Sequence, residues 1–203
     1  MEKTKYVFVG AGGHARVLAS VIESNHGELL AVFDSNPNRP ALDEVKNIGE
    51  YQQEKHPHAK ILIAIGDNAI RERISQEINH TVGQAIHAKA IVDRLAKLAQ
   101  GVQVIQGAVV NRGSSIGQHS IVNTNATVDH DCEVGDFVHI APGATLCGGV
   151  KVGKGSLIGA NATVLPNCII GKNVSVGAGA VVTTNLPDNV VVAGVPAKII
   201  KHG

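Results

Sequence analysis

A period of six residues dominates the second part of this sequence and limits the folds that the chain can adopt. From Ile86 to Val182, every sixth residue is Val, Ile or Leu, without a break in register. The residue four positions after each anchor from Ile86 to Val176 is also restricted, to Ala, Ser, Cys or Val. Chance would essentially never produce such a run, so the period indicates a repeated structural unit.

A strict period of six predicts a hexapeptide β-helix. In this fold three hexapeptides complete one triangular turn, and successive turns pair as strands about 4.8 Å apart. The anchor fills the interior, and the small residue fits near a corner. The scarcity of aromatic residues, 2% of the chain, suits a narrow interior. We expect about five turns between Ile86 and Val182, with the following tail covering the open end of the coil.

The first part of the chain alternates short apolar strands with helices, which is typical of a parallel sheet. We expect strands at residues 6–9, 29–33 and 61–65, a helix after the first strand, and a helix after the third with Ile70, Ile74 and Ile78 on one stripe. This predicts a Rossmann-like half domain over residues 1–81, too short for a complete dinucleotide fold. The all-β helix with its C-terminal cap then occupies residues 82–203.

Composition excludes several classes of function. The formal net charge of +1 gives no electrostatic basis for binding nucleic acid or an anionic membrane, and a chain without Trp offers no base-stacking platform. Three Cys without a CxxC motif argue against a disulfide framework. We find neither a signal peptide nor an apolar run of about 18 residues, so we expect a cytoplasmic protein without a membrane span.

A glycine-rich segment, Gly10-Ala11-Gly12-Gly13-His14-Ala15, lies between the first expected strand and its helix. It fits the G-x-G-x-x-A form in which backbone N–H groups hold phosphates. Asp34 ends the next strand, where a ribose-binding acid would stand. Alone, this pattern would suggest NAD, but the half-sized domain and the attached coil favour a nucleotide sugar. The alternative is that this segment only makes a tight strand–helix connection and binds no ligand.

His130 is neither an anchor nor a small position, so its side chain should leave the coil. One turn further along stand Gly148 and Gly149, which leave open space beside an imidazole and beside Asp131. A thioester carbonyl could lie there and accept a hydrogen bond from the Gly148 N–H, which would stabilise an oxyanion. Histidine is the natural base near neutral pH. The alternative is that His130 is an ordinary solvated histidine in a turn.

Three segments together with the hexapeptide run give a family resemblance. They are Gly10-Ala11-Gly12-Gly13-His14, the stretch from Ile63 to Asn68 followed by Arg71, and Val128-Asp129-His130-Asp131-Cys132. The chain resembles the bacterial nucleotide-amino-sugar N-acetyltransferases of the bacillosamine type (PglD), grouped with the sialic acid O-acetyltransferases (NeuD). The terminal Gly194-Val195-Pro196-Ala197-Lys198 is similar to that of left-handed β-helix acyltransferases.

The resemblance implies a homotrimer that transfers acetyl from acetyl-CoA to the 4-amino group of a nucleotide-linked trideoxy amino sugar in glycan biosynthesis. It makes His130 the general base and Asp131 the residue that tunes it. Acetyl-CoA would lie between the coils of adjacent subunits, in contact with His139, with Gly148 and with the backbone of Ala160 and Ala178. No metal is implied.

The resemblance also assigns the nucleotide sugar to the N-terminal domain. It implies contacts from His14, from Asp34 and from Ser35, which stands where the family often has a second Asp. The Gly12-Gly13 turn, Gly66 and Asn68 at the same sheet edge, and Asn123 on the coil complete the expected site.

Other functions stay open at this point. O-acetylation of sialic acid or a related sugar would use the same fold and base. A γ-type carbonic anhydrase would need three His around a metal, and the spacing of His119, His130 and His139 does not match that family. A non-catalytic scaffold or nucleotide sensor would not bind CoA. A long-chain acyl donor would need an apolar groove that the sequence does not indicate.

Overall fold

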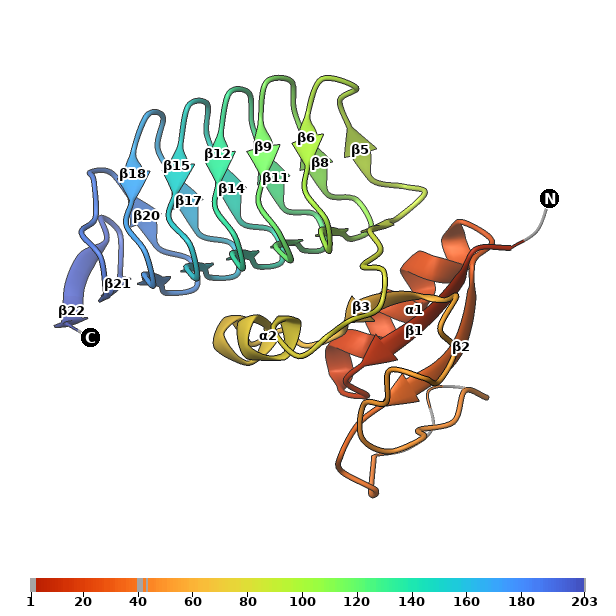
Figure 1. Ribbon diagram of the computed structural model, residues 1–203. Coiled ribbons are helices and arrows are strands. Elements are labelled where there is room, and N and C mark those ends of the chain that lie inside the picture. Colours follow the sequence, from red (N-terminus) through yellow and green to blue (C-terminus); the bar gives the residue numbers. More distant parts are fainter. Residues whose placement is uncertain (1–2, 40–41, 43, 203) are drawn as a thin grey trace.

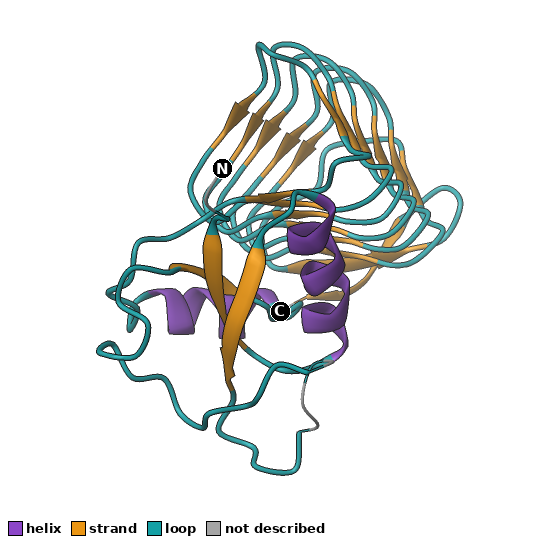
Figure 2. Cartoon of the chain, turned by 90° about the vertical axis from the view of Figure 1, so that its right-hand side faces the viewer, coloured by secondary structure: helices purple, strands orange, loops and turns teal. Residues whose placement is uncertain are grey.

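The computed structural model describes residues 3–39, 42 and 44–202. Its larger part is a three-sided coil of two-residue parallel strands, seen from the side in Figure 1 and from near one end in Figure 2. The repeat strands of its first face are β4 (Ala85–Ile86), β7 (Gln103–Val104), β10 (Ile121–Val122), β13 (His139–Ile140), β16 (Leu157–Ile158) and β19 (Ser175–Val176).

The second face consists of β5 (Ile91–Val92), β8 (Val109–Val110), β11 (Thr127–Val128), β14 (Thr145–Leu146), β17 (Thr163–Val164) and β20 (Val181–Val182). The third face consists of β6 (Lys97–Leu98), β9 (Ser115–Ile116), β12 (Glu133–Val134), β15 (Lys151–Val152) and β18 (Ile169–Ile170). The predicted β-helix is confirmed. The coil makes about six turns rather than the five expected, because the second face alone carries six strands.

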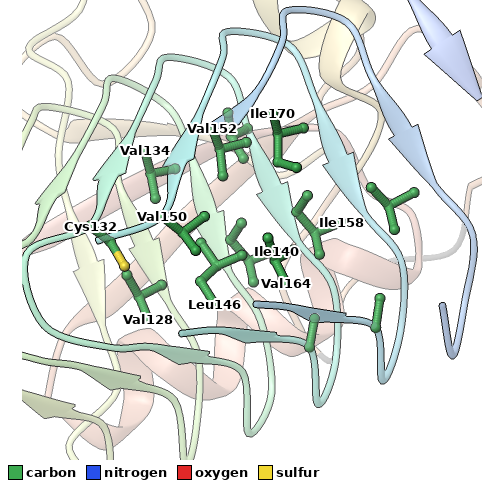
Figure 3. Packing of buried hydrophobic residues seen from close by; sticks show 14 of the residues in the cluster. Val128, Cys132, Val134, Ile140, Leu146, Val150, Val152, Ile158, Val164 and Ile170 are labelled. Atoms are coloured by element: carbon green, nitrogen blue, oxygen red, sulfur yellow. The ribbon is translucent and has the colours of Figure 1, made fainter. Parts of the chain in front are cut away.

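The six-residue period arises because each strand ends on an anchor that points inward. Val128 pairs with Leu146 and Val134 with Val152, a register of one 18-residue turn. Figure 3 shows the anchors filling the interior, and almost all of them from Val104 to Val182 are buried. The small residues four positions later, such as Ala126 and Ala144, are fully buried beside them, as the sequence predicted.

The corners of the coil require left-handed backbone, and glycine alternates there with side chains that overlie it. One corner column contains Gly107, Asn125, Gly143, Asn161 and Gly179, all with φ between 52° and 77°. A Cβ on Gly107 would collide with the Asn125 side chain, and one on Gly143 with Asn161. Glycine is therefore needed beneath each asparagine for space as well as for its backbone conformation.

The smaller part of the molecule is a three-stranded parallel sheet in the order β2-β1-β3. Its strands are β1 (Lys5–Val9), β2 (Glu28–Phe33) and β3 (Lys60–Ile63). Helix α1 (Gly13–Ser24) buries Leu18, Val21 and Ile22 among other residues, and α2 (Asn68–Ser75) lies beside the sheet and below the coil in Figure 1. The expected Rossmann-like half is thus confirmed.

The prediction for α2 was wrong in one respect. The helix ends at Ser75, before Ile78, and its buried residue is Arg71 rather than an isoleucine. Ile70 is 41% exposed, whereas Ile74 and Ile78 are half-buried and pack against apolar residues of the small sheet. All three also line a cavity. The stripe has the spacing of a core, but the face of α2 that the tertiary structure buries is the one turned toward the coil.

The chain ends with two longer strands at the far end of the coil. β21 (Val190–Ala193) adds to the first face next to β19, and β22 (Lys198–His202) pairs antiparallel with it. Leu186, Val190 and Val192 are buried against the last interior anchors. In the described part of the chain, no helix is both long and apolar enough to cross a membrane.

Two glycine substitutions in one corner column test the packing rule. Gly143→Ala and Gly179→Ala share the left-handed conformation, which disfavours alanine by about 1–2 kcal/mol. Only Gly143 lies beneath a side chain, while nothing lies within 4 Å of a Cβ on Gly179. We expect Gly143→Ala to lower the Tm clearly more than Gly179→Ala in thermal denaturation. Equal losses would contradict the rule.

Candidate active site

His130 lies at the corner that follows β11, between the second and third faces, and points out of the coil. Its side chain is 63% exposed, and its Nδ1 is 2.9 Å from Asp131 Oδ2. Asp131 is in the left-handed conformation, with φ of 59°, and Asp129 Oδ1 accepts a hydrogen bond from the His130 N–H at 2.8 Å. Asp131 thus contacts the imidazole, and Asp129 holds the backbone of the turn that carries it.

Gly148 lies directly against the His130 imidazole. A Cβ at Gly148 would come within 2.5 Å of Nε2 and 2.6 Å of Cε1, so only glycine leaves the ring where it is. Within the described residues, the Gly148 N–H donates to no hydrogen-bond partner. Gly149 N–H, in contrast, donates to the His130 carbonyl at 2.9 Å, which holds the two turns in register. The predicted neighbourhood of His130, Asp131 and Gly148 is present.

The two carboxylates set the protonation of the exposed imidazole. The hydrogen bond to Asp131, followed by the negative charge of Asp129, raises the pKa of His130 above its ordinary value. With Nδ1 facing Asp131, the ring keeps Nε2 for other partners. A histidine of this kind accepts a proton at Nε2 while the neighbouring carboxylate stabilises the resulting imidazolium.

The glycine-rich loop lies at the C-terminal edge of the small sheet. Gly12 precedes α1 without any side-chain cap, and both Gly12 and Gly13 face open space. The free N–H groups of a helix N-terminus suit an anion such as a phosphate. Asp34 Oδ2 accepts the Ala11 N–H at 2.8 Å, so this carboxylate also holds the loop in place.

A cavity of about 470 Å³ adjoins this loop. Asp34 and Ser35 line it after β2, and the isoleucine stripe lines it from α2 and the following residues, together with the charged Arg73 and Glu77. A flat, partly apolar group attached to a phosphate bound at Gly12 would fit such a space.

His14 and His139 meet where the small sheet faces the coil, with ring centroids 6.4 Å apart. His14 Nε2 lies 2.6 Å from Gln103 Oε1, and Gln103 Nε2 donates to the Ile63 carbonyl. The glutamine oxygen therefore faces the ring, and His14 donates from Nε2. Burial, and after it the charge of Arg71, lowers the pKa of His14 and so favours its neutral form.

His139 is fixed just as closely. Its Nδ1 donates to the Gly66 carbonyl at 3.2 Å, and its Nε2 accepts from Asn123 Nδ2 at 2.9 Å. The Thr124 N–H binds Asn123 Oδ1, which turns the amide nitrogen toward the histidine. Burial, then the charges of Arg71 and His14, lowers the pKa of His139 to about 4. His139 is therefore neutral at physiological pH.

The expected nucleotide-sugar residues thus gather in one region, and His139 lies among them. Asn68 is also there and donates from Nδ2 to the carbonyls of Gly155 and Ser156. His139, expected to contact acetyl-CoA, is joined to Gly66 and Asn123 instead of standing apart from them. It is on the first face, whereas His130 follows the second face, so one chain does not bring the two histidines together.

The remaining expected residues form a column at the corner between the first and second faces. Asn161 N–H donates to the Pro142 carbonyl at 2.9 Å, and Gly179 N–H donates to the Ala160 carbonyl at 2.8 Å. Pro142 and Ala178 are exposed and Ala160 is partly so. This column and His130 lie at opposite ends of the strands of the second face.

Two residues at this junction were not given a role by the sequence. Gln103 is fully buried between His14 and Ile63, and Arg71 is fully buried between α2 and the coil. A charged residue on the inward face of a short helix was the available signal for Arg71. Among the described residues, no group of three His, Cys, Asp or Glu side chains is arranged to hold a metal ion.

Comparison with known families matches both parts of the chain. Residues 5–78 match the family described as the PglD N-terminal domain. Residues 113–148 and 149–184 match the bacterial transferase hexapeptide family. Over 122 residues the chain is 36% identical to the uncharacterized protein L142 of Acanthamoeba polyphaga mimivirus, and this match spans 57% of the chain but only 22% of that protein.

Solved structures match over nearly the whole chain. A mutant of perosamine N-acetyltransferase from Caulobacter crescentus, in complex with CoA and GDP-perosamine, is 35% identical with a TM-score of 0.94 and 97% of each chain covered. The acetyltransferase domain of PglB from Neisseria gonorrhoeae, in complex with acetyl coenzyme A, is 35% identical with a TM-score of 0.90, covering 98% of this chain and 100% of that one. WeeI from Acinetobacter baumannii is 25% identical, with a TM-score of 0.84, 97% of this chain and 100% of that one covered.

The contact between His130 and Asp131 predicts a measurable titration change. Asp131→Asn removes the charge and the main cause of the raised pKa, so the His130 midpoint should move to lower pH in an NMR titration. Glu133→Gln is the matched control, because Glu133 is a nearby exposed carboxylate paired with Lys151. An unchanged midpoint in Asp131→Asn would contradict the assigned pair.

Proposed function

This chain belongs to the PglD-type nucleotide-sugar N-acetyltransferases, a family with a left-handed β-helix, and we propose on that premise that it acetylates the 4-amino group of a nucleotide-linked trideoxy amino sugar. It is an acetyl-CoA-dependent acyltransferase. The observation that carries the proposal is His130, an outward imidazole between Asp131 and the bare backbone of Gly148. The family match supplies the reaction class, and this arrangement supplies a base for it.

The proposed chemistry is direct transfer. The sugar amine attacks the thioester carbonyl carbon while His130 Nε2 takes a proton from the attacking nitrogen. The tetrahedral oxyanion accepts a hydrogen bond from the Gly148 N–H. The carbon–sulfur bond then breaks, the amide forms, and the departing CoA sulfur receives the proton from His130. Asp131 supports the imidazolium between these two steps.

The nucleotide sugar is proposed to bind with its diphosphate at Gly12 and Gly13 and its base toward the cavity beside Asp34 and Ser35. The sugar then extends toward His14, Asn123 and His139. The Caulobacter relative binds GDP-perosamine at 35% identity, which supports a 4-amino sugar on a nucleoside diphosphate. Gly66 and Asn68 complete the proposed site from the third strand's loop.

Acetyl-CoA is proposed to run along the exposed column of Pro142, Ala160 and Ala178. His130 and this column are at opposite ends of the second-face strands, so a site that contains both needs a second copy of the chain.

The outward positions of the second face are uncharged, namely Ile91, Val109, Thr127, Thr145, Thr163 and Val181. The third face carries Lys97, Glu133 and Lys151 instead. We therefore propose a homotrimer packed through the second face, with His130 of one copy reaching acetyl-CoA held beside another.

The activity is tested by thiol release from acetyl-CoA with GDP-perosamine, a UDP-linked 4-amino sugar and matched 4-hydroxy sugars. We expect turnover only with the amino sugars, and a loss of about 10²–10⁴-fold in His130→Ala. His87→Ala, on the exposed first turn of the coil, is the matched control. Turnover with hydroxyl acceptors would favour sugar O-acetylation instead. Full activity of His130→Ala would overturn the assigned base.

The assembly is tested by adding a charge to one face. Thr145→Lys introduces an ammonium on the uncharged second face, where burying it without a partner is unfavourable. We expect this variant to dissociate in analytical ultracentrifugation and to lose acetyl transfer. Ser115→Lys makes a similar change on the charged third face and should stay trimeric. A trimeric Thr145→Lys protein would show that another face forms the interface.

A further inference from the structure

Helix α2 contacts the coil through a ladder of three backbone carbonyls at one corner. His119, Phe137 and Gly155 are one turn apart from each other along this corner. Arg71 Nε donates to the His119 carbonyl at 2.7 Å and Arg71 Nη2 to the Phe137 carbonyl at 3.3 Å. Asn68 Nδ2 donates to the Gly155 carbonyl at 3.0 Å. Two side chains of one short helix thus bind three successive turns.

The guanidinium of Arg71 is fully buried, and all three of its nitrogens donate hydrogen bonds. Besides the two coil carbonyls, Nη1 donates to the carbonyls of Ile65 and Gly66 at 3.0 and 3.1 Å. Nη2 also donates to Asn68 Oδ1 at 2.7 Å. Among the described residues, no carboxylate lies within ion-pair distance of Arg71. Neutral oxygens accept its hydrogen bonds, and the negative charge of Asp67, the residue before α2, also favours the charged guanidinium.

The corner beneath α2 is built differently from the others. Where the other two corners place Gly, Asn or Asp, this column has His119 and Phe137, with φ of 53° and 55°. Their rings stack at 5.4 Å with an angle of 6°, and both residues are buried. A left-handed phenylalanine is a strained choice that persists only where the surroundings enforce it. The sequence at this corner therefore departs from the repeat where Arg71 binds.

One oxygen links Arg71 to the proposed sugar site. The Gly66 carbonyl accepts from Arg71 Nη1 and also from His139 Nδ1. We propose that Arg71 is a positioning residue for acetyl transfer, which fixes the Gly66 carbonyl and, through it, holds His139 as a neutral ring aligned with Asn123. The inference rests on the proposed function for its kinetic consequence, although the state of His139 can be measured without it.

The positive charge of Arg71 favours the neutral form of His139. Burial makes the largest contribution to the low pKa of His139, and the cation of Arg71 makes the next. Among the described residues, the other titratable group whose charge lowers the pKa of His139 is His14 from α1, and the pKa of His14 is lowered by burial and by Arg71 as well. Removing the cation should therefore raise both pKa values part of the way, while burial still holds them low.

Two substitutions separate the charge of Arg71 from its hydrogen-bonding fork. Arg71→Met removes both, and Arg71→Lys keeps a cation but cannot bind five oxygens at once. The control is Glu72→Gln, which breaks the ion pair between Glu72 and Lys154 of the coil at 2.6 Å and leaves Arg71 in place. Titration of His139 by NMR, identified by the signal absent in His139→Gln, is measured on the intact protein beside acetyl-transfer kinetics with GDP-perosamine.

We expect Arg71→Met to move the His139 midpoint to higher pH and Arg71→Lys to leave it almost unchanged. Both should raise KM for the nucleotide sugar, with kcat/KM for it lower by about 10²-fold, and leave KM for acetyl-CoA unchanged. Glu72→Gln should alter none of these values. A His139 midpoint that stays in place in Arg71→Met, or an unchanged sugar KM in folded Arg71→Lys, would overturn the inference.

The two proposals can fail separately. If the wild-type protein acetylates no nucleotide sugar, the proposed function fails, but the His139 titration in Arg71→Met still decides whether Arg71 controls that ring. If Arg71→Met does not fold, Arg71→Lys carries the test through the sugar KM. Arg71→Lys and Glu72→Gln could lose acetyl transfer to the same extent, with losses that follow only the Tm. That result would indicate a structural role for Arg71 and overturn the positioning role.

Discussion

Each turn of the coil is hydrogen-bonded to the next through its backbone, and the rest of the molecule depends on that ladder. Thr127 N–H donates to the Ala144 carbonyl at 2.9 Å, and Asp129 N–H to the Leu146 carbonyl at 3.0 Å. Because the ladder has the same register on all three faces, every turn must have the same length. This accounts for an unbroken period, small residues inside the corners and glycine beneath the corner asparagines.

The fixed register also determines what faces a functional side chain. A residue in one turn always lies beside the residue 18 positions away in the next turn, so the His130 imidazole lies against Gly148. A corner can therefore present an exposed imidazole whose position is set by the whole coil rather than by a mobile loop. Such rigid support is what a base needs when it must reach one nitrogen of a bound sugar.

The small sheet is attached to this rigid coil by polar contacts as much as by apolar ones. Arg71, Asn68 and Gln103 each bind backbone or side-chain groups across the junction, and each is wholly or partly buried there. Directional hydrogen bonds fix the relative orientation of two units more precisely than apolar contact alone. The phosphate-type loop before α1 is thereby held at a fixed place relative to Asn123 and His139. His130 lies at a different corner of the coil. The proposed assembly of several copies is therefore needed to bring the base to the bound substrates.

The sequence by itself determined every feature that depends on local pattern: the coil, its interior, the outward direction of His130, its glycine neighbour and the parallel half-sheet. These follow because the strand register repeats, so spacing along the chain becomes position in space. It did not determine the contacts of Arg71, the joining of His139 to Gly66, or the exposure of Ile70. Those depend on the path of the chain between the sheet and the first coil strand, which no period encodes. The tertiary structure alone decided which face of α2 is buried. That face carries Arg71 and Asn68, and the carbonyls that they bind belong to a corner of the coil far along the chain.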